Sequence, residues 1–252
     1  MIKRHLQILE MVSSRQKLEV SVLAKLLGVS KVTVRKDLAE LEQMGVLRRE
    51  HGYAVIGAVD DIGRRLAYHY DLKKRIAQAA AQIVADGETV MIESGSCCAL
   101  LAEELANTKR EITIITNSAF IANHIRHAFH AKIILLGGDY QGEAQVVTGP
   151  IAIKCAEDFF TDKFFIGADG FTEKFGFTGR DHLRAVTVQG IAKQARQVMV
   201  LTESEKFHHQ GVVGLVRIAD ITAVYTDDHI PPETEDLLVK NQVMVHKTPV
   251  DG

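Results

Sequence analysis

The chain has 252 residues, of which 46% are hydrophobic and 25% are charged, and its formal net charge is −2. This length allows one large or two modest domains, each with enough apolar residues for a core. No apolar run approaches the ~20 residues of a membrane span, the N-terminus lacks a signal-peptide core, and three cysteines predict no disulfide framework. These features argue against a membrane or secreted protein and predict a reduced, cytoplasmic one.

A helix-turn-helix pattern occupies residues 18–43. Apolar residues from Leu18 to Leu27 predict a short helix, and the turn Gly28-Val29-Ser30 follows, where glycine can adopt the positive φ of a sharp helix exit. Ser30 is suited to cap a second helix over residues 31–43, in which apolar residues recur at the spacing of one buried face. The order of helix, turn and cap is typical of a DNA-binding head.

Hydroxyl and cationic side chains gather at the start of the second helix, where a recognition helix meets base edges and phosphates. Residues 45–55 predict a hairpin with cations near its tip, a wing that can lie along the DNA backbone. The side chains expected to contact DNA are Ser30, Lys31, Thr33, Val34, Arg35, Lys36, Arg48, Arg49 and His51.

Charge is distributed unevenly along the chain. Residues 1–57 carry 10 lysines and arginines against 6 acids, whereas the rest of the chain carries 20 against 26. A basic segment joined to an acidic one is typical of a protein in which one module faces phosphate. We therefore predict a winged helix-turn-helix domain at residues 1–57, a linker at 58–72 and a second domain at 73–252. An ordinary solvated helix pair is the alternative interpretation.

From residue 73 onwards, segments with helical periodicity alternate with short apolar runs. Continuous apolar strands that alternate with helices predict an α/β domain with a parallel sheet covered on both faces. The predicted strands are residues 89–93, 112–116, 132–136, 163–167, 198–202 and 221–226, and the predicted helices are residues 76–84, 99–106, 119–129, 150–159 and 182–195.

Small, polar or charged residues follow successive strands, and ligands of parallel sheets bind at the carboxyl ends of the strands. The loop after the first strand leads directly into a helix, so that it offers backbone N–H groups and hydroxyls that suit a phosphate. Carboxylates and a lysine at the same edge suit a phosphorylated sugar or polyol. No nucleotide-binding fingerprint is present. The residues expected to bind this effector are Glu93, Ser94, Gly95, Ser96, Cys97, Asn117, Ser118, Gly137, Gly138, Asp169, Gly170 and Lys206.

The motifs together resemble one family. Residues 23–42 look like the helix-turn-helix of the DeoR family of bacterial sugar-operon regulators, and the resemblance covers roughly residues 4–245. The matching motifs of the second domain are Glu93-Ser94-Gly95-Ser96, Thr116-Asn117-Ser118, Leu136-Gly137-Gly138, Gly167-Ala168-Asp169-Gly170 and Ser204-Glu205-Lys206-Phe207. The resemblance implies a winged-helix repressor whose sensor domain is similar to ribose-5-phosphate isomerase and CoA-transferase folds. It also implies release from operator DNA by a phosphosugar, and a dimer or tetramer.

The chain departs from the family pattern at three places. The family's first loop usually opens with Asp and continues Gly-Thr-Thr, whereas this chain has Glu93 and Ser96-Cys97. Its Thr-Asn-x-x-Glu motif is replaced by Thr178–Arg184, and its Asp before Ser-x-Lys-Phe is Glu203. Arginine can bind phosphate or carboxylate with two hydrogen bonds, so a sugar acid is an alternative effector. The departures add Arg180, Asp181 and Arg184 to the expected effector-binding residues.

Two rival functions are open at this point. An isomerase-like enzyme could use Asp169, Asp181 and Lys206 for acid–base chemistry, but an isomerase needs no DNA-binding head, so we expect no catalytic residues. A thiol- or metal-responsive regulator would need reactive or ligating side chains. Adjacent cysteines rarely serve one tetrahedral metal, and we expect no metal site and no cofactor. The residues that raise this second alternative are Cys97, Cys98, His124, His127, His130, His208 and His209.

Overall fold

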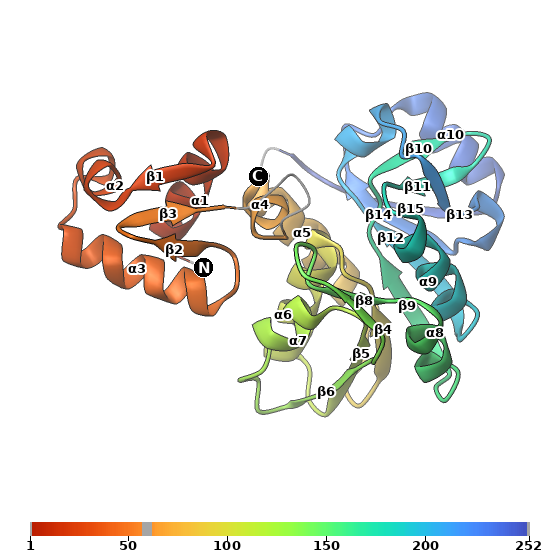
Figure 1. The fold of residues 1–252 in the computed structure, drawn as a ribbon. Helices are drawn as coiled ribbons and strands as arrows, with labels where there is room; N and C mark the ends of the chain where they lie inside the picture. The colour runs from red at the N-terminus through yellow and green to blue at the C-terminus, as the bar shows by residue number, and fades with distance from the viewer. Residues whose placement is uncertain (1, 57–61, 251–252) are drawn as a thin grey trace. The chain divides into compact units, whose positions relative to one another are not determined.

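The computed structural model describes residues 2–56 and 62–250 (Figure 1). Contacts divide the chain into two units, which we call the head, Met1–Tyr70 with Gly142–Ala144, and the body, Asp71–Gln141 with Gln145–Gly252. Residues 57–61, which include the start of the predicted linker, lie outside the described residues. Among the described residues, no helix is long and apolar enough to cross a membrane.

The head contains helices packed on a small antiparallel sheet of strand order β1-β3-β2 (Figure 1). The predicted recognition helix and wing are present. Ser30 caps α3, since its Oγ accepts a hydrogen bond from Thr33 N at 3.1 Å, and Gly28 takes φ +66°. The elements are α1 (Lys3–Arg15), β1 (Lys17–Glu19), α2 (Val20–Leu27), α3 (Lys31–Gln43), β2 (Arg48–Glu50), β3 (Tyr53–Val55) and α4 (Ile62–Ala67).

The head differs from the prediction at its edges. Leu18 lies in β1 rather than in the helix, and Leu26 is exposed on α2 rather than buried. Helix α1 was not predicted, yet its Ile8 and Leu9 are fully buried in the core of the head. Helix α4, which falls in the predicted linker, packs against α1. Gly63 of α4 approaches the wing so closely that a Cβ there would lie 2.0 Å from Val46 O.

An ion pair fastens α1 to the recognition helix α3. Arg4 donates from Nε and Nη2 to the two carboxylate oxygens of Asp37, at 2.5 and 2.8 Å, and the Asp37 side chain is almost completely buried. His5 Nε2 lies 3.5 Å from the same carboxylate. The hydrogen bond from Arg4 lowers the pKa of Asp37, against the desolvation that would raise it.

Because Asp37 is ionised more readily in the folded head than in the unfolded chain, it contributes stability above its unfolded pKa. That contribution is lost as the pH falls through the folded-state pKa. We expect Asp37→Asn to lower the Tm at neutral pH, and we expect its Tm and that of the parent protein to converge as the pH falls from about 5 to about 2. Thermal melts across that range check the prediction. A difference that does not shrink in acid would contradict it.

The body is built on a seven-stranded sheet of order β15-β14-β12-β9-β4-β5-β6, in which every neighbouring pair is parallel. This confirms the predicted α/β architecture. The strands of the sheet are β4 (Thr89–Ile92), β5 (Ile112–Thr116), β6 (Ala131–Leu135), β9 (Thr161–Ile166), β12 (Ala195–Leu201), β14 (Ala223–Asp227) and β15 (Met244–Thr248). The helices are α5 (Tyr70–Ala81), α6 (Ser96–Thr108), α7 (Ala119–His124), α8 (Pro150–Ala156), α9 (His182–Ala192) and α10 (Pro232–Lys240), with 3₁₀ turns η1 (Ser204–His208) and η2 (Ile218–Asp220).

The order of the strands reverses beside β4. The chain proceeds from β4 to β5 and β6 on one side, then returns to place β9 on the other side. The crevice at the carboxyl ends of the two strands that flank such a reversal is where open parallel sheets bind ligands. The loops after β4 and β9 therefore occupy the position in this fold that favours a ligand.

Two small antiparallel sheets were not predicted. They are the hairpin of β7 (Asp139–Gln141) with β8 (Val146–Thr148), and the sheet of β10 (Gly170–Thr172), β11 (Gly176–Gly179) and β13 (Val213–Val216). Phe171, Phe177 and Phe207 meet edge to face beneath the second sheet, with ring centroids 5.1–5.8 Å apart. These aromatic contacts form part of the core that supports the strand-end loops.

Candidate functional site

The exposed face of α3 carries the polar groups expected of a recognition helix. Lys31, Arg35 and Lys36 are exposed, as is the capping residue Ser30. Val34 is wrong as a DNA contact, because it is fully buried and points into the core of the head. The face available to a nucleic acid therefore includes hydroxyl and cationic side chains at the beginning of the helix, with the apolar Val32, 74% exposed, among them.

The two arginines of the wing differ in their surroundings. Arg48 is exposed on β2, and His51, with φ +44°, forms the tip of the hairpin. Arg49 instead binds Glu42 of α3, with Nε 2.6 Å from Oε2 and its backbone N 2.9 Å from Oε1. This pairing lowers the pKa of Glu42. Of the two wing arginines expected to contact DNA, Arg49 already holds a partner inside the head.

Arg35 lies on the exposed face of α3 among the other cations. We expect Arg35→Ala to weaken binding to a selected DNA duplex by about 1–3 kcal/mol, since a base contact of a recognition helix is worth this much. Lys36→Ala, at a position typical of a phosphate contact, is expected to weaken binding to all sequences and to flatten the salt dependence. Fluorescence anisotropy at several salt concentrations measures both effects. Lys240→Ala removes the same charge from α10 of the body and should change neither the affinity for DNA nor its salt dependence. Equal losses of affinity in Arg35→Ala, Lys36→Ala and Lys240→Ala would refute a specific role for α3.

At the strand reversal, Glu93 joins the loops that follow β4 and β9. Its Oε1 accepts a hydrogen bond from Ser94 Oγ at 2.6 Å, and its Oε2 accepts one from Gly167 N at 3.2 Å. A Cβ at Gly95 would lie only 3.1 Å from Gly167 Cα, so the two loops pack backbone to backbone. The Glu93 carboxylate is buried in this contact and serves as a clamp between the loops, rather than as a side chain presented to a ligand.

Helix α6 begins at this point without a capping side chain. Gly95 is its N-cap and has no side chain that could accept a hydrogen bond from the first turn, and that turn contains no acidic residue. Ser96, its first residue, is half-buried. A helix of this length has a partial positive charge at its N-terminus, and its free N–H groups form a ready anion site.

A buried lysine that sequence analysis missed stands beside this helix end. Lys73 of α5 is 2% exposed, and its Nζ lies 3.3 Å from Oε2 of Glu203, which follows β12 and is 3% exposed. Burial lowers the pKa of Lys73, and the charge of Glu203 opposes that shift. In the sequence, Lys73 stands next to a second lysine and is expected to be solvated. Its burial is evident only in the tertiary structure.

The charged groups of Lys73, Glu203 and Lys206 lie close enough to act on the thiol of Cys97. Burial, with the nearby negative charge of Glu203, raises the pKa of the Cys97 thiol to about 12. A thiol-responsive regulator needs a lowered pKa, so this direction weighs against that alternative. Cys97 therefore contributes packing, and the two lysines supply positive charge near the start of α6.

Asn117 and Ser118 support the fold at the end of β5. Asn117 Nδ2 donates to Val147 O at 3.1 Å and thereby fastens the β7–β8 hairpin, and Ser118 Oγ accepts from Ile121 N at 3.1 Å as the cap of α7. Both side chains are almost completely buried. The structure thus uses these two expected effector contacts to build the edge of the sheet.

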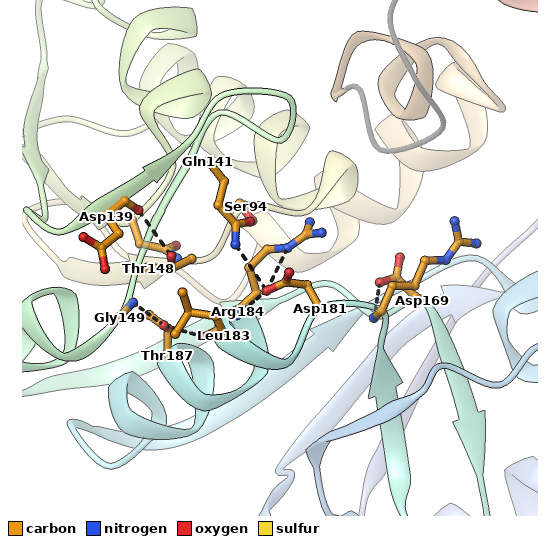
Figure 2. A network of polar contacts seen from close by, with 12 residues as sticks. Ser94, Asp139, Gln141, Thr148, Gly149, Asp169, Asp181, Leu183, Arg184 and Thr187 are labelled. Carbon is orange, nitrogen blue, oxygen red and sulfur yellow. Dashed lines mark hydrogen bonds and ion pairs between the residues drawn. The ribbon is translucent and has the colours of Figure 1, made fainter.

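Four of the other expected residues, Asp169, Arg180, Asp181 and Arg184, make polar contacts around the start of α9 (Figure 2). Asp181 caps this helix by accepting from Arg184 N at 2.7 Å, and Gln141 Nε2 donates to the same oxygen at 3.3 Å. Arg184 Nε lies 3.8 Å from it. Asp169 Oδ2 accepts from Arg180 N at 3.2 Å. Hydrogen bonds from the backbone and from Gln141, together with Arg184, lower the pKa of Asp181 despite desolvation, so Asp181 is an ionised cap rather than a proton donor.

Three expected glycines differ in their surroundings. Gly137 and Gly138 are exposed after β6, and Gly138 has φ +144° against the backbone of Thr148. Gly170 is buried, and a Cβ there would lie 2.5 Å from His209 O. Gly170 is therefore required by the packing of β10. Of these three glycines, Gly137 and Gly138 are the ones whose backbone is exposed.

A winged head with a cationic recognition face, joined in one chain to a parallel α/β body, defines a helix-turn-helix transcriptional regulator. The DeoR-like helix-turn-helix domain matches residues 4–58, and the DeoR C terminal sensor domain matches residues 68–228. The chain belongs to the DeoR family.

Curated relatives match almost the whole chain. The HTH-type transcriptional repressor CsqR of Escherichia coli is 28% identical over 96% of this chain and 94% of its own length. The glycerol-3-phosphate regulon repressor of the same species is 26% identical over 96% and 97%. A ribose 5-phosphate isomerase from Methanocaldococcus jannaschii covers 55% of each chain with 21% identity and a TM-score of 0.41, a similarity too low to bear on activity.

Proposed function

We propose that this chain is a cytoplasmic transcriptional repressor of an operon for carbohydrate catabolism or transport, and that a phosphorylated sugar or sugar derivative releases it from operator DNA. The match of both family domains along one chain carries the proposal. The cationic start of α3 supports DNA as the partner of the head. A relative is named a glycerol-3-phosphate regulon repressor, which supports a phosphorylated polyol or sugar as the class of signal.

The phosphate of the effector binds at the start of α6. Backbone N–H groups of the first turn, starting at Ser96, donate hydrogen bonds to it, and Lys206 adds a cation on η1. Lys73, paired with Glu203, lies behind this site within the body. Glu93 and Cys97 stand behind this site as packing and clamping residues, in place of the direct contacts expected from sequence.

The sugar part of the effector meets the polar network at α9 (Figure 2). Asp169 is half-buried and has carboxylate acceptors for hydroxyls, and Arg180 is exposed. Arg184 can bind a second anionic group with two hydrogen bonds, which keeps a phosphorylated sugar acid within the effector class. Gly137 and Gly138 allow close approach of the ligand along the backbone after β6.

A screen of ligands tests this function. Thermal unfolding is measured with sugar phosphates, polyol phosphates, phosphorylated sugar acids, their unphosphorylated parents and inorganic phosphate. We expect a phosphorylated compound to raise the Tm more than its parent or phosphate alone does, and to weaken binding to a DNA duplex selected by this protein from a random pool. Stabilisation by a compound without phosphate, or stabilisation without DNA release, would contradict the proposal.

The repressor acts as a homo-oligomer, a dimer or tetramer. A single recognition helix reads only a few base pairs, so useful specificity needs two heads on repeated half-sites. We expect sedimentation at micromolar concentration to give a dimer or tetramer with and without DNA. A monomer in both conditions would refute this part of the proposal.

A further inference from the structure

The face on which a wing residue lies follows from the register of the small sheet of the head. Arg49 of β2 pairs with Ala54 of β3, and Ala54 pairs in turn with Leu18 of β1. Ala54 is fully buried and Leu18 nearly so. Directly paired residues have side chains on the same face of a sheet, so that Arg49 lies on the inner face. Arg48, its neighbour along the strand, lies on the outer face.

On the inner face, Arg49 meets the end of the recognition helix. Its guanidinium contacts Glu42 Oε2 through both Nε, at 2.6 Å, and Nη2, at 2.5 Å, while its own backbone N donates to Glu42 Oε1 at 2.9 Å. One carboxylate thus holds both the side chain and the backbone of a wing residue. Two side-chain contacts and one backbone contact fix the orientation of β2 relative to α3 as well as the distance between them.

We infer that Arg49 and Glu42 form a strut that sets the position of the wing relative to α3, and that Arg48 is the wing arginine that contacts DNA phosphate. Arg49 acts through the geometry of the wing and is a positioning residue. This inference rests on DNA binding by the head. It reverses the expectation, drawn from sequence, that both arginines contact phosphate.

The two interpretations of Arg49 predict opposite effects for Glu42→Gln. If Arg49 contacts phosphate, removing the competing acid frees it, and DNA binding becomes tighter. If the pair is a strut, the wing loses its fixed position, and binding weakens by up to about fivefold, the most that an exposed ion pair of this kind contributes. Glu50→Gln is the matched control, because it also removes one negative charge from the head. Glu50 is an exposed wing residue that pairs with Tyr53 and does not hold Arg49. It should tighten binding or leave it unchanged.

Salt dependence separates the two arginines. Arg48→Gln removes a phosphate contact, so the slope of log affinity against log salt should become shallower by about 0.9. Arg49→Gln should weaken binding with the slope unchanged, and the double variant Glu42→Gln/Arg49→Gln should be no weaker than either single variant. Affinities are measured by fluorescence anisotropy with a duplex selected by the unvaried chain from a random pool.

A measurement without DNA tests the strut independently of the proposed function. Hydrogen exchange of the free protein should be faster for the backbone amides of residues 48–55 in Glu42→Gln than in Glu50→Gln, with the Tm of the two variants similar. Unchanged exchange in Glu42→Gln, tighter DNA binding by that variant, or a shallower salt slope for Arg49→Gln would each overturn the strut.

Discussion

Lys73→Met is expected to destabilise the protein by about 3–5 kcal/mol, since the substitution leaves the carboxylate of Glu203 buried without its lysine. Lys73 and Glu203 are 2% and 3% exposed, so water cannot solvate the remaining charge without a local opening of the body. Urea unfolding followed by circular dichroism measures the loss. A change smaller than about 1 kcal/mol, the value typical of solvated surface pairs, would show that the pair is not desolvated.

The double variant Lys73→Met/Glu203→Met distinguishes a lost ion pair from poor packing. Replacing both members of a buried pair with apolar side chains of similar volume is often neutral or stabilising. We therefore expect the double variant to recover most of the stability lost in Lys73→Met. We expect its response to the effector to stay weaker than that of the unvaried protein, because the Lys73 ammonium is lost, although Lys206 and the N-terminus of α6 remain. Recovery of both stability and response would remove Lys73 from the effector site.

Ser96→Glu is expected to give a repressor that binds DNA but no longer responds to the effector. The new carboxylate occupies the first turn of α6, where a negative charge is favourable for the helix and unfavourable for an incoming phosphate. Losing two charge-assisted hydrogen bonds of about 1.5 kcal/mol each corresponds to a midpoint for DNA release about 100-fold higher. Titration of the best compound from the thermal screen against the protein–DNA complex measures the midpoint.

Ser96→Gln is the matched control for this variant, since glutamine has nearly the size of glutamate without its charge. We expect its midpoint to lie much closer to that of the unvaried protein. An equal shift in the two variants would indicate steric obstruction rather than electrostatic exclusion. Release of Ser96→Glu from DNA at the original effector concentration would mean that the phosphate binds at another loop.

The sequence predicts the parts of this fold that local chemistry specifies. Ser30 and the spacing of apolar residues predict α3 with its observed bounds, and runs of apolar residues predict six of the seven parallel strands, all but β15. Helix α1 escapes prediction because it begins after Ile2 without a side-chain cap. The short strands β7, β8, β10 and β11 also escape, because segments of three or four residues are too short to show a period.

The candidate sites are predicted less completely, because a polar side chain beside a strand end can bind either a ligand or the protein itself. Asn117, Ser118 and Asp181 suit both roles in sequence, and the structure shows that each one serves a hairpin or a helix cap. Lys73 escapes for the converse reason, since its burial depends on Glu203, which is far away in the chain. Successive side chains of a strand point to opposite faces of the sheet, so the predicted hairpin by itself implies that Arg48 and Arg49 lie on opposite faces.

The close contact between Gly95 and Gly167 restricts how this body can be redesigned or can diverge. A side chain at either position enters the space of the opposite backbone, and Glu93 joins the same two loops by a hydrogen bond. The loops after β4 and β9 are therefore coupled, and we expect that replacing one with the loop of a relative with a different effector, while the other is retained, disturbs the contact between them. Grafting a new specificity into this scaffold requires that positions 93, 95 and 167 be transplanted together.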